Sequence, residues 1–402
     1  MQLTKEQQHI VHATKGHILV DATAGSGKTT TLIHCVQHAI KNGISPSQIL
    51  MVTSTESAKQ RLDELLHATR VQPTTFEALS RKIAQGFEEK GLLEEAQYFS
   101  EEETFQHLTA AITDAYERSG QSIENEDFSH STIYLDALLK RFNVFKNTMK
   151  LSDVLKQENS YEEIVDILAI DKVTLVTFEA YENRRKKLGF RTSIDMVYDV
   201  VQAIEDEFNG INFFADNYVL ILVDEFHDIN EAQLRLLRVL AGKYTRVIAV
   251  GDAEQCINTA LSADPVLMQH RFDEEFPAAQ HLPLRESFRF GPHPALIINS
   301  LFKKIHEKRG KFCVSKQKRK TEIDIQFYES HSSTEVVDTL LKWESKGNPL
   351  PDAAILVREF AHTIPIESLL IQQKIPYQIL GGKPFFRASG GIVFTRAFTF
   401  GC

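Results

Sequence analysis

A short run of small residues, Asp21–Thr30 (DATAGSGKTT), limits the folds open to this chain because it lies between an apolar segment and an amphipathic one. It supplies A-x-x-x-x-G-K-T from Ala22, the P-loop pattern with Ala in place of the first Gly. Small residues let backbone N–H groups close around phosphate oxygens at a helix N-terminus. A turn without a ligand is the alternative, but the strand–loop–helix context favours a phosphate site. The predicted cradle is Ala24, Gly25, Ser26, Gly27, Lys28, Thr29 and Thr30, in which Lys28 reaches the β- and γ-phosphates and Thr29 binds Mg²⁺.

An acidic pair follows an almost wholly apolar segment later in the chain. Leu220–Asp228 has the sequence LILVDEFHD, so Asp224 and Glu225 come directly after a predicted buried strand. In open α/β sheets, ligands bind at the carboxyl ends of the strands. We therefore predict that Asp224 holds Mg²⁺, directly or through water, and that Glu225 polarises the attacking water. An apolar strand that ends in two acidic residues is common by itself, but with the P-loop it indicates hydrolysis of a nucleoside triphosphate.

The composition is that of a folded protein. The chain has 402 residues, with 45 Lys and Arg against 54 Asp and Glu, and a formal net charge of −9. These values exclude a disordered, collagenous or disulfide-stapled chain, and the length suggests two or three domains. No segment reaches the ~18 consecutive apolar residues of a membrane helix, and no secretory signal or CxxC pair is present. We expect a soluble, cytoplasmic protein without a membrane or a metal other than Mg²⁺.

Hydrophobic periodicity divides the chain into stretches of different pattern. Residues 1–85 alternate β-branched runs with amphipathic segments, which is the βαβ pattern of a parallel sheet. Residues 86–190 show helical spacing with a loop expected at Gln121–Ser129, and the βα pattern then returns. A second α/β unit is expected to begin near residue 281. The predicted strands are His17–Asp21, Ile49–Thr53, Tyr218–Val223 and Arg246–Val250, and then, in the second unit, Glu322–Phe327, Ala353–Val357 and Pro376–Leu380.

Several short motifs, each weak by itself, follow one another along the chain. They are Leu3–Val11 (LTKEQQHIV), Thr53–Ala58 (TSTESA), Thr75–Leu79 (TFEAL), Ser193–Met196 (SIDM), the acidic motif extended to DEFHDINEAQ, Val250–Ile257 (VGDAEQCI), Leu284–Phe290 (LRESFRF) and, near the end, IPYQILGGKPFF. In this order, and together with the P-loop, they resemble the UvrD/Rep-like superfamily 1 DNA helicases.

The resemblance implies an α/β P-loop NTPase with a RecA-like parallel-sheet domain, a helical insertion and a second, incomplete RecA-like domain. The first, ATP-binding domain would comprise 1–85 plus 191–280, the inserted helical subdomain 86–190, and the second, apparently truncated domain 281–402. In this family ATP binds with Mg²⁺ between the two RecA-like domains, and single-stranded DNA lies across them. The resemblance thus implies an ATP-dependent DNA helicase or translocase that moves with 3′→5′ polarity.

The resemblance also implies roles for single residues. It places Gln7 on the adenine and stacks Phe288 on the same base. Gln255 would sense the γ-phosphate, and Arg289 would contact that phosphate from the second domain. Together with Glu225 and the P-loop lysine, Gln255 and Arg289 form the expected catalytic set.

The chain departs from the family pattern where the family grips DNA. Ser54 stands where an aromatic residue is usual, Glu77 replaces a His, and residues 258–261 (NTAL) lack the usual two aromatics and Arg. Stacking contributes about 1–3 kcal/mol per base, so we expect weaker binding of single-stranded DNA or a shorter footprint than is usual in the family. Phe76 has two open interpretations, as a stacking group or as a core residue.

The sequence also stops before the family's last two motifs, which include an arginine that acts across the cleft. Such an arginine contributes about 10³–10⁵ in rate in P-loop enzymes. We therefore expect a fragment, a chain completed by a protein partner in a repair or defence complex, or slow hydrolysis. One alternative stays open, an ATP-binding, DNA-associated subunit with little unwinding activity of its own. A small-molecule kinase is disfavoured by the ordered motifs.

Basic residues are concentrated in one stretch of this acidic chain. Residues 303–320 hold nine Lys or Arg against the single acidic residue Glu307. A second, shorter basic run is Arg184–Lys187 (RRKK). Each run could follow nucleic-acid phosphates or form a solvated surface, and the sequence leaves both interpretations open.

Overall fold

The computed structural model describes residues 2–119, 131–157, 159–207, 217–305, 311–325, 327 and 333–380. The chain forms two compact units, Met1–Glu322 and Ile323–Cys402. Within the described ranges, we find no helix with the length and apolar character needed to cross a membrane. The loop expected at Gln121–Ser129 and the GGKPFF part of the last motif fall outside the described residues.

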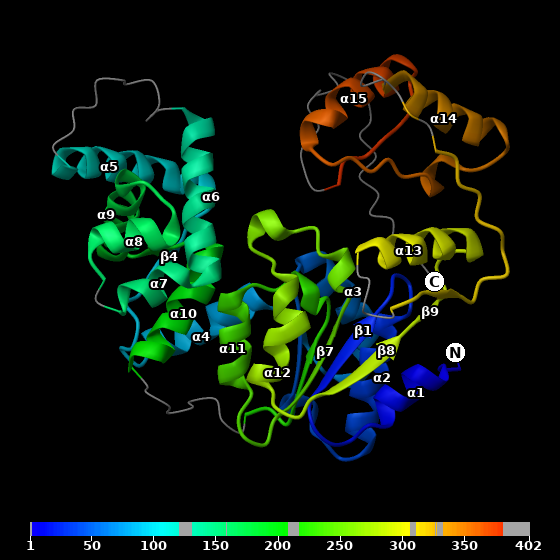
Figure 1. Cartoon of the computed structure of the whole chain (residues 1–402), viewed down its shortest axis with the longest axis horizontal. Helices are drawn as coiled ribbons and strands as arrows, with labels where there is room; N and C mark the ends of the chain where they lie inside the picture. The colour runs from blue at the N-terminus through cyan, green and yellow to red at the C-terminus, as the bar shows by residue number, and fades with distance from the viewer. Residues whose placement is uncertain are drawn as a thin grey trace. The chain divides into compact units, whose positions relative to one another are not determined.

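A six-stranded parallel sheet forms the centre of the first unit (Figure 1). Its strand order is β3-β2-β6-β7-β1-β8, so β1, which leads into the P-loop, is an interior strand. The four strands predicted for this unit are confirmed, and the sheet gives the expected α/β, RecA-like class. The strands are β1 (Ile18–Ala22), β2 (Ile49–Thr53), β3 (Pro73–Thr75), β6 (Leu220–Val223), β7 (Arg246–Gly251) and β8 (Gln280–Leu284).

Both faces of this sheet are buried. Successive side chains of a strand point to opposite faces, so Leu220 and Leu222 of β6 enter one core while Ile221 and Val223 enter the other. Nearly continuous apolar strands are typical of parallel sheets covered on both sides. Each fully buried aliphatic side chain contributes about 1.5–3 kcal/mol, so these two cores hold the strand ends of the site in place.

Two sets of helices cover the two faces, as their membership in the two cores shows. The first set is α1 (Lys5–His12), α2 (Lys28–Lys41) and α3 (Glu56–Leu66). The second set is α4 (Phe76–Glu88), α10 (Ser193–Glu207), α11 (Glu231–Leu240) and α12 (Phe272–Glu275). Phe76, at the start of α4, is 1% exposed within the second core, which decides the open question in favour of a core residue.

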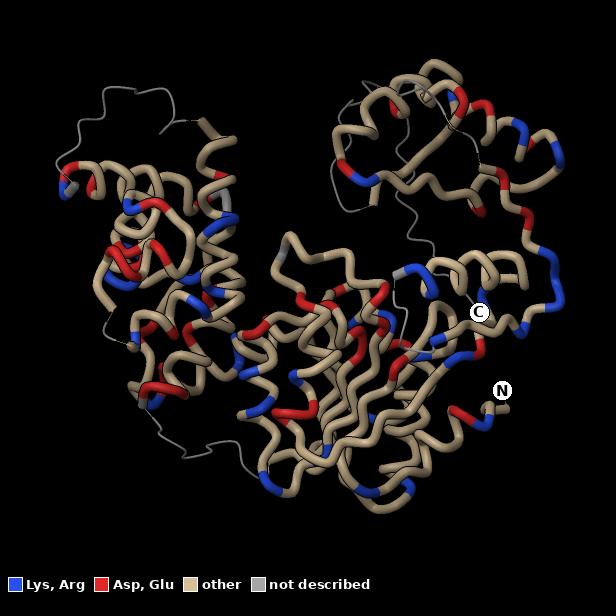
Figure 2. Tube along the Cα trace, in the orientation of Figure 1, with Lys and Arg blue, Asp and Glu red and all other residues tan. Residues whose placement is uncertain are grey.

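A helical region stands between α4 and α10 in the chain, as the helical spacing predicted. It contains α5 (Glu101–Ser119), α6 (Thr132–Thr148), α7 (Lys150–Leu155), α8 (Tyr161–Leu168) and α9 (Lys172–Leu188), with the short pair β4 (Gln97–Tyr98) and β5 (Phe190–Arg191). Its phenylalanines form a separate core in which Phe142 packs against Phe145 and Phe178. Positions of Lys and Arg are interspersed with positions of Asp and Glu along the backbone of this region (Figure 2).

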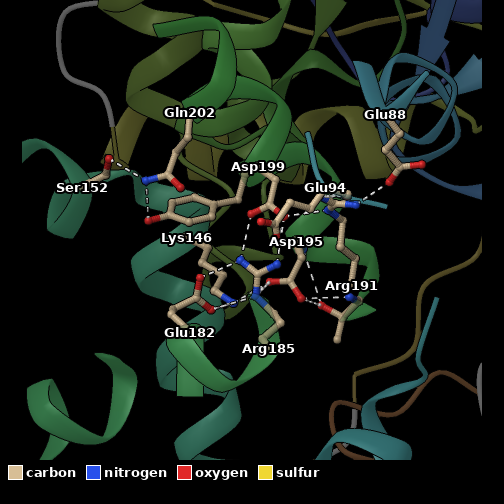
Figure 3. A network of polar contacts seen from close by, with 12 residues as sticks. Glu88, Glu94, Lys146, Ser152, Glu182, Arg185, Arg191, Asp195, Asp199 and Gln202 are labelled. Carbon is tan, nitrogen blue, oxygen red and sulfur yellow. Dashed lines mark hydrogen bonds and ion pairs between the residues drawn. The ribbon is translucent and has the colours of Figure 1, made fainter. Parts of the chain in front are cut away.

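A network of buried charges joins this helical region to the sheet domain (Figure 3). Arg185 of α9 is 1% exposed, and its guanidinium donates to Glu182 at 3.1 and 2.6 Å and to Asp199 of α10 at 2.8 and 2.8 Å. Because α10 also packs against the sheet, the network ties the two layers together. The remaining members are Lys146 of α6, which pairs with Glu182 at 2.6 Å and Asp195 at 2.5 Å, and Arg191 of β5, which pairs with Asp199 at 2.7 Å and Glu88 at 2.5 Å.

The boundary of the second unit differs from the expected one. The second domain was predicted to begin at 281, but β8 begins at Gln280 and pairs with β1 in the first sheet. After β8 the chain forms β9 (Glu286–Ser287), α13 (Pro292–Ile305) and β10 (Val314–Ser315), which belong to the first unit, and this unit ends in the sequence at Glu322.

The three strands predicted in the last part of the chain are wrong for the residues that the structure describes. Residues 322–325, 327, 353–357 and 376–380 carry no strand, because none of them joins a ladder with another described segment. Leu356, in the middle of one of these runs, is 94% exposed. In the described part of this unit, α14 (Ser333–Ser345) and α15 (Thr363–Gln372) share a small apolar core.

Candidate nucleotide site

The P-loop connects β1 to α2 by a backbone that only small residues adopt easily. Gly25 has φ of +73° and Gly27 has φ of +83°. Both values lie in the left-handed region, where a side chain causes strain. Gly27 precedes the first turn of α2 and offers no side-chain cap, so the first N–H groups of the helix are left for another acceptor. Lys28, Thr29 and Thr30 occupy that first turn, as predicted.

Gln7 packs directly on the P-loop from α1. Thr4 and Gln7 form a capping box that fixes the start of this helix. The Gln7 amide also donates from Nε2 to the carbonyl of Ser26 at 3.2 Å. A Cβ added to Gly27 would come within 2.7 Å of the same Nε2. The predicted adenine-side residue is therefore in contact with the phosphate loop, and a larger residue at 27 would displace it.

The acidic motif lies against the P-loop, as expected from its place at the end of β6. Thr29 donates from Oγ1 to Asp224 Oδ2 at 2.8 Å, and Lys28 Nζ lies 3.5 Å from Glu225 Oε2. Burial raises the pKa of Asp224 to about 6, and the neighbouring Glu225 adds to this increase. Glu225 has φ of +52°, an uncommon backbone for a residue that is not glycine.

These residues fit Mg²⁺ and a triphosphate. Mg²⁺ prefers hard oxygen ligands, and Thr29 and Asp224 present a hydroxyl and a carboxylate 2.8 Å apart. A buried carboxylate whose pKa is raised is one that a divalent cation would neutralise. Lys28 and the left-handed glycines of the loop supply the positive charge and the backbone N–H groups that phosphates require.

A second polar layer connects the acidic motif to the segment after β7. His227 is 4% exposed, and its Nδ1 lies 3.7 Å from Glu225 Oε2. Nδ1 also accepts the backbone N–H of Asp252 at 3.1 Å, so the ring proton is on Nε2. Burial lowers the pKa of His227, which keeps the ring neutral. Asp252 in turn accepts a hydrogen bond from the Gln255 amide, so Gln255 is joined to the acidic motif through Asp252.

The segment after β8 closes over the P-loop. Ser287 donates from Oγ to the carbonyl of Ala24 at 2.8 Å, and the Phe288 backbone N–H donates to the carbonyl of Gly25 at 2.9 Å. A Cβ on Gly25 would lie 2.5 Å from the Cβ of Arg289. Phe288 is 40% exposed, and Arg289 is exposed as well. Both predicted residues thus stand beside the loop with side chains accessible to a ligand.

Sequence reasoning missed two residues that belong to this arrangement. Ser287 lies inside a recognised motif, but only the structure shows its bond to the P-loop backbone. Lys311 lies in the basic stretch 303–320, and its ammonium contacts Asp21, Asp252 and Glu254 at 2.7, 2.7 and 2.5 Å. A lysine within a basic run carries no sequence signal that separates it from a solvated one.

Two of the positions that depart from the family pattern make contacts of their own. Glu77 pairs with Arg81 at 3.0 Å on the surface of α4. Asn258 donates from Nδ2 to Asp228 at 3.1 Å, whereas the preceding Ile257 is 73% exposed. Glu77 therefore presents a carboxylate where the family pattern has a His, and the Asn258 amide is held by Asp228.

Comparison with known proteins agrees with this geometry. The family model described as the UvrD/REP helicase N-terminal domain matches residues 3–277. The chain is also similar to the ATP-dependent DNA helicase PcrA of Staphylococcus epidermidis, at 24% identity over 396 residues, which is 96% of this chain and 51% of the relative. The PcrA of Staphylococcus aureus is 23% identical over 396 residues, which is again 96% of this chain and 51% of the relative. The chain spans about half the length of the curated relatives that it matches. Because the family model covers more than half of the sequence, the chain belongs to the UvrD/REP helicase family.

Proposed function

We propose that this chain is the ATP-binding and ATP-hydrolysing part of a DNA helicase or translocase. The observation that carries the proposal is the meeting of the P-loop with the acidic motif, in which Thr29 donates to Asp224 and Lys28 lies 3.5 Å from Glu225. Hydrolysis of a triphosphate needs positive charge at the transferred phosphoryl group and a base for the attacking water. Lys28 supplies the first, and Glu225 supplies the second.

The proposed division of labour follows the positions of the side chains. Thr29 and Asp224 hold Mg²⁺, which neutralises charge on the phosphates when it is bound. Glu225 is 35% exposed, so a water molecule can reach it, and its carboxylate accepts the proton of that water. The same carboxylate lies 3.5 Å from the Lys28 ammonium, which places the proposed base next to the proposed phosphate-binding charge.

The other site residues would bind and sense the nucleotide. We propose that Gln7 and Phe288 recognise the adenine, the first from α1 and the second from the segment that covers the P-loop. Gln255 and Arg289 would respond to the γ-phosphate. Arg289 stands beside Gly25 with its side chain exposed, which allows it to turn toward the phosphates.

The partner that we propose is single-stranded DNA, with movement in the 3′→5′ direction. Family membership supports DNA as the partner. Glu77 adds negative charge at an expected contact, and the Asn258 amide is engaged by Asp228. We therefore expect weaker binding of single-stranded DNA by this chain than is usual in the family.

The test is steady-state ATP hydrolysis by the 402-residue chain, with and without an unstructured DNA oligonucleotide. We expect DNA to raise the rate at least about tenfold and Glu225→Gln to abolish hydrolysis while ATP still binds. Lys28→Ala should abolish both hydrolysis and ATP binding. A near-zero rate with intact ATP binding would instead favour the alternative of a nucleotide-binding, DNA-associated subunit. Absence of ATP binding would refute both forms of the proposal.

A further inference from the structure

Lys311 contacts a cluster of three carboxylates at the carboxyl edge of the sheet. Its Nζ lies 2.7 Å from Asp21 at the end of β1, 2.7 Å from Asp252 after β7 and 2.5 Å from Glu254. The Lys311 side chain is 7% exposed, and its ammonium lies 5.6 Å from the centre of the Phe302 ring. A lysine that is nearly buried and that touches three carboxylates is held in one position, unlike a solvated surface lysine.

The cluster leads directly to the residue that would sense the γ-phosphate. Lys311 binds Asp252 through Oδ1, while Oδ2 of the same carboxylate accepts the Gln255 amide. The Gln255 backbone N–H also donates to the carbonyl of Asp252 at 2.8 Å. An amide NH₂ group has two N–H donors, so the bond to Asp252 orients the group and leaves one donor for a ligand oxygen.

Charge balance explains why this orientation depends on the lysine. Asp252 and Glu254 have side chains that are 1% and 8% exposed, so water does little to screen the charges at this place. Burial opposes ionisation of Asp252, but Lys311, together with hydrogen bonds from Glu254 and Gln255, outweighs burial and lowers the pKa of this carboxyl. Burial and a side-chain hydrogen bond to Asp252 raise the pKa of Glu254. Without the ammonium, Asp252 would lose the main opposite charge beside it and the contact that fixes its Oδ1.

Lys311 also lies just before β10, the strand that pairs with β9 beside the P-loop. Three residues later, β10 pairs with β9 in parallel register, Val314 with Glu286 and Ser315 with Ser287. Ser287 is the residue whose hydroxyl donates to the P-loop carbonyl of Ala24. One short segment therefore contacts both the sensing side and the covering side of the candidate nucleotide site.

We infer that Lys311 is a positioning residue that fixes Asp252 and, through it, the Gln255 amide for recognition of the terminal phosphate of a nucleoside triphosphate. This inference rests on the proposed function, because it assigns Gln255 to the γ-phosphate. Lys311 itself touches no ligand in this scheme. Its loss should therefore weaken binding of a triphosphate and leave binding of a diphosphate unchanged.

The experiment measures equilibrium binding of two nucleotides to the 402-residue chain by titration calorimetry in the presence of Mg²⁺. The ligands are ADP and the β,γ-imido analogue of ATP, which is not hydrolysed. For Lys311→Met we expect about a tenfold loss of affinity for the analogue, since one charge-assisted hydrogen bond is lost, and less than about a twofold change for ADP. Lys311→Arg, which keeps the charge, should restore most of the lost affinity.

A matched control and a double-mutant cycle separate positioning from general damage. Lys316→Met removes a lysine of the same segment that pairs with Glu286 at the surface, and it should change neither affinity. Gln255→Ala should reproduce the selective loss, and Lys311→Met combined with Gln255→Ala should add little to it, because both changes remove one interaction. If Lys311→Met does not fold, Lys311→Met with Glu254→Gln removes a cation and an anion together and allows the same titrations.

The outcomes distinguish the inference from the proposed function. A selective loss for the triphosphate analogue that is not additive with Gln255→Ala supports the inference. Equal losses of affinity for both nucleotides, or no loss of affinity at all, overturn the inference. The proposed function still stands in that case if the unaltered chain binds the nucleotides. Failure of the unaltered chain to bind either nucleotide refutes the proposed function, and the role of Lys311 falls with it.

Discussion

Replacement of Arg185 by methionine should be among the most destabilising single changes in the helical region. Methionine is unbranched and fits an apolar site, but it removes every hydrogen bond that the guanidinium makes to Glu182 and Asp199. The network then has the buried carboxylates of Glu182, Asp195 and Asp199, and the partly buried Glu88, against only two cations, Lys146 and Arg191. At least one buried negative charge is left without compensation.

The magnitude follows from that imbalance. Breaking a buried ion pair by removal of one partner costs about 3–5 kcal/mol, which is a large share of the roughly 5–15 kcal/mol that stabilises a typical domain. Burial opposes ionisation of Glu182, but Arg185 and Lys146 outweigh it and lower the pKa of this carboxyl to about 2. A carboxyl with a lowered folded-state pKa stabilises the fold above its unfolded pKa, near 4.3, and this contribution disappears as the pH falls.

The pH dependence provides the sharper signature. In Arg185→Met the same carboxyls stay buried without the guanidinium, so their folded-state pKa values rise and they take up protons more readily. The difference in unfolding free energy between the unaltered chain and the variant should therefore be largest near pH 7.5 and should shrink as the pH falls toward 4.5.

The assay is urea unfolding followed by far-UV circular dichroism at several pH values. Lys187→Met, an exposed change on the same helix, is the control and should stay within about 0.5 kcal/mol of the unaltered chain. Arg185→Met with Asp199→Asn should recover part of the loss, because it removes one unpaired charge. The fluorescence of Trp343, the only tryptophan, reports on the second unit. A loss below about 1 kcal/mol that does not vary with pH would refute the reasoning.

Three further changes test the nucleotide site. Gly25→Ala should weaken nucleotide binding and destabilise the chain by about 1–3 kcal/mol, because Gly25 has a left-handed backbone and the new Cβ would meet Arg289. The control is Gly43→Ala, which has a similar φ but open space around it. This change should leave nucleotide affinity unchanged in the same calorimetric titration. Gln7→Ala should lower the midpoint of thermal unfolding, because the capping box and the bond to Ser26 are both lost, and a melting point unchanged within error would contradict this. Phe288→Ala should weaken ATP binding several-fold yet keep the unfolding free energy within about 0.5 kcal/mol, because the ring is partly exposed. A loss of both ATP affinity and unfolding free energy would instead show that the ring has a packing role.

Local sequence patterns predicted which residues of the candidate site lie close together, because these residues follow strands and begin helices. The P-loop and the acidic pair each come directly after an apolar run, and parallel strands bring their carboxyl ends to one edge. Gln7 and Arg289 were placed in the site by family resemblance. Gln7 contacts the P-loop and Arg289 lies beside it, although the roles of both residues stay predictions. The role of Phe76 could not be decided from the sequence, because a phenylalanine suits a stacking position and a core position equally well.

Features that depend on distant partners could not be predicted. The apolar run 353–357 has the composition of a strand, but composition does not show whether another strand lies beside it. Gln280–Leu284 is separated from β1 by more than half of the chain, so its pairing in the first sheet is invisible to local periodicity. Lys311 was hidden for the same reason, because its three carboxylate partners come from segments far away in the sequence.

The interior position of β1 sets an order of events during synthesis. Ile18 pairs with Ile248 on one side and with Gln280 on the other. The P-loop strand is thus made before either neighbour, and roughly 230 more residues, or about 10–50 s at common elongation rates, must be added before its first neighbour exists. During that interval an apolar strand with two unpaired edges is a target for chaperones and for aggregation. Slow synthesis or a pause before residue 284 should therefore lower the yield of soluble chain more than a pause after it.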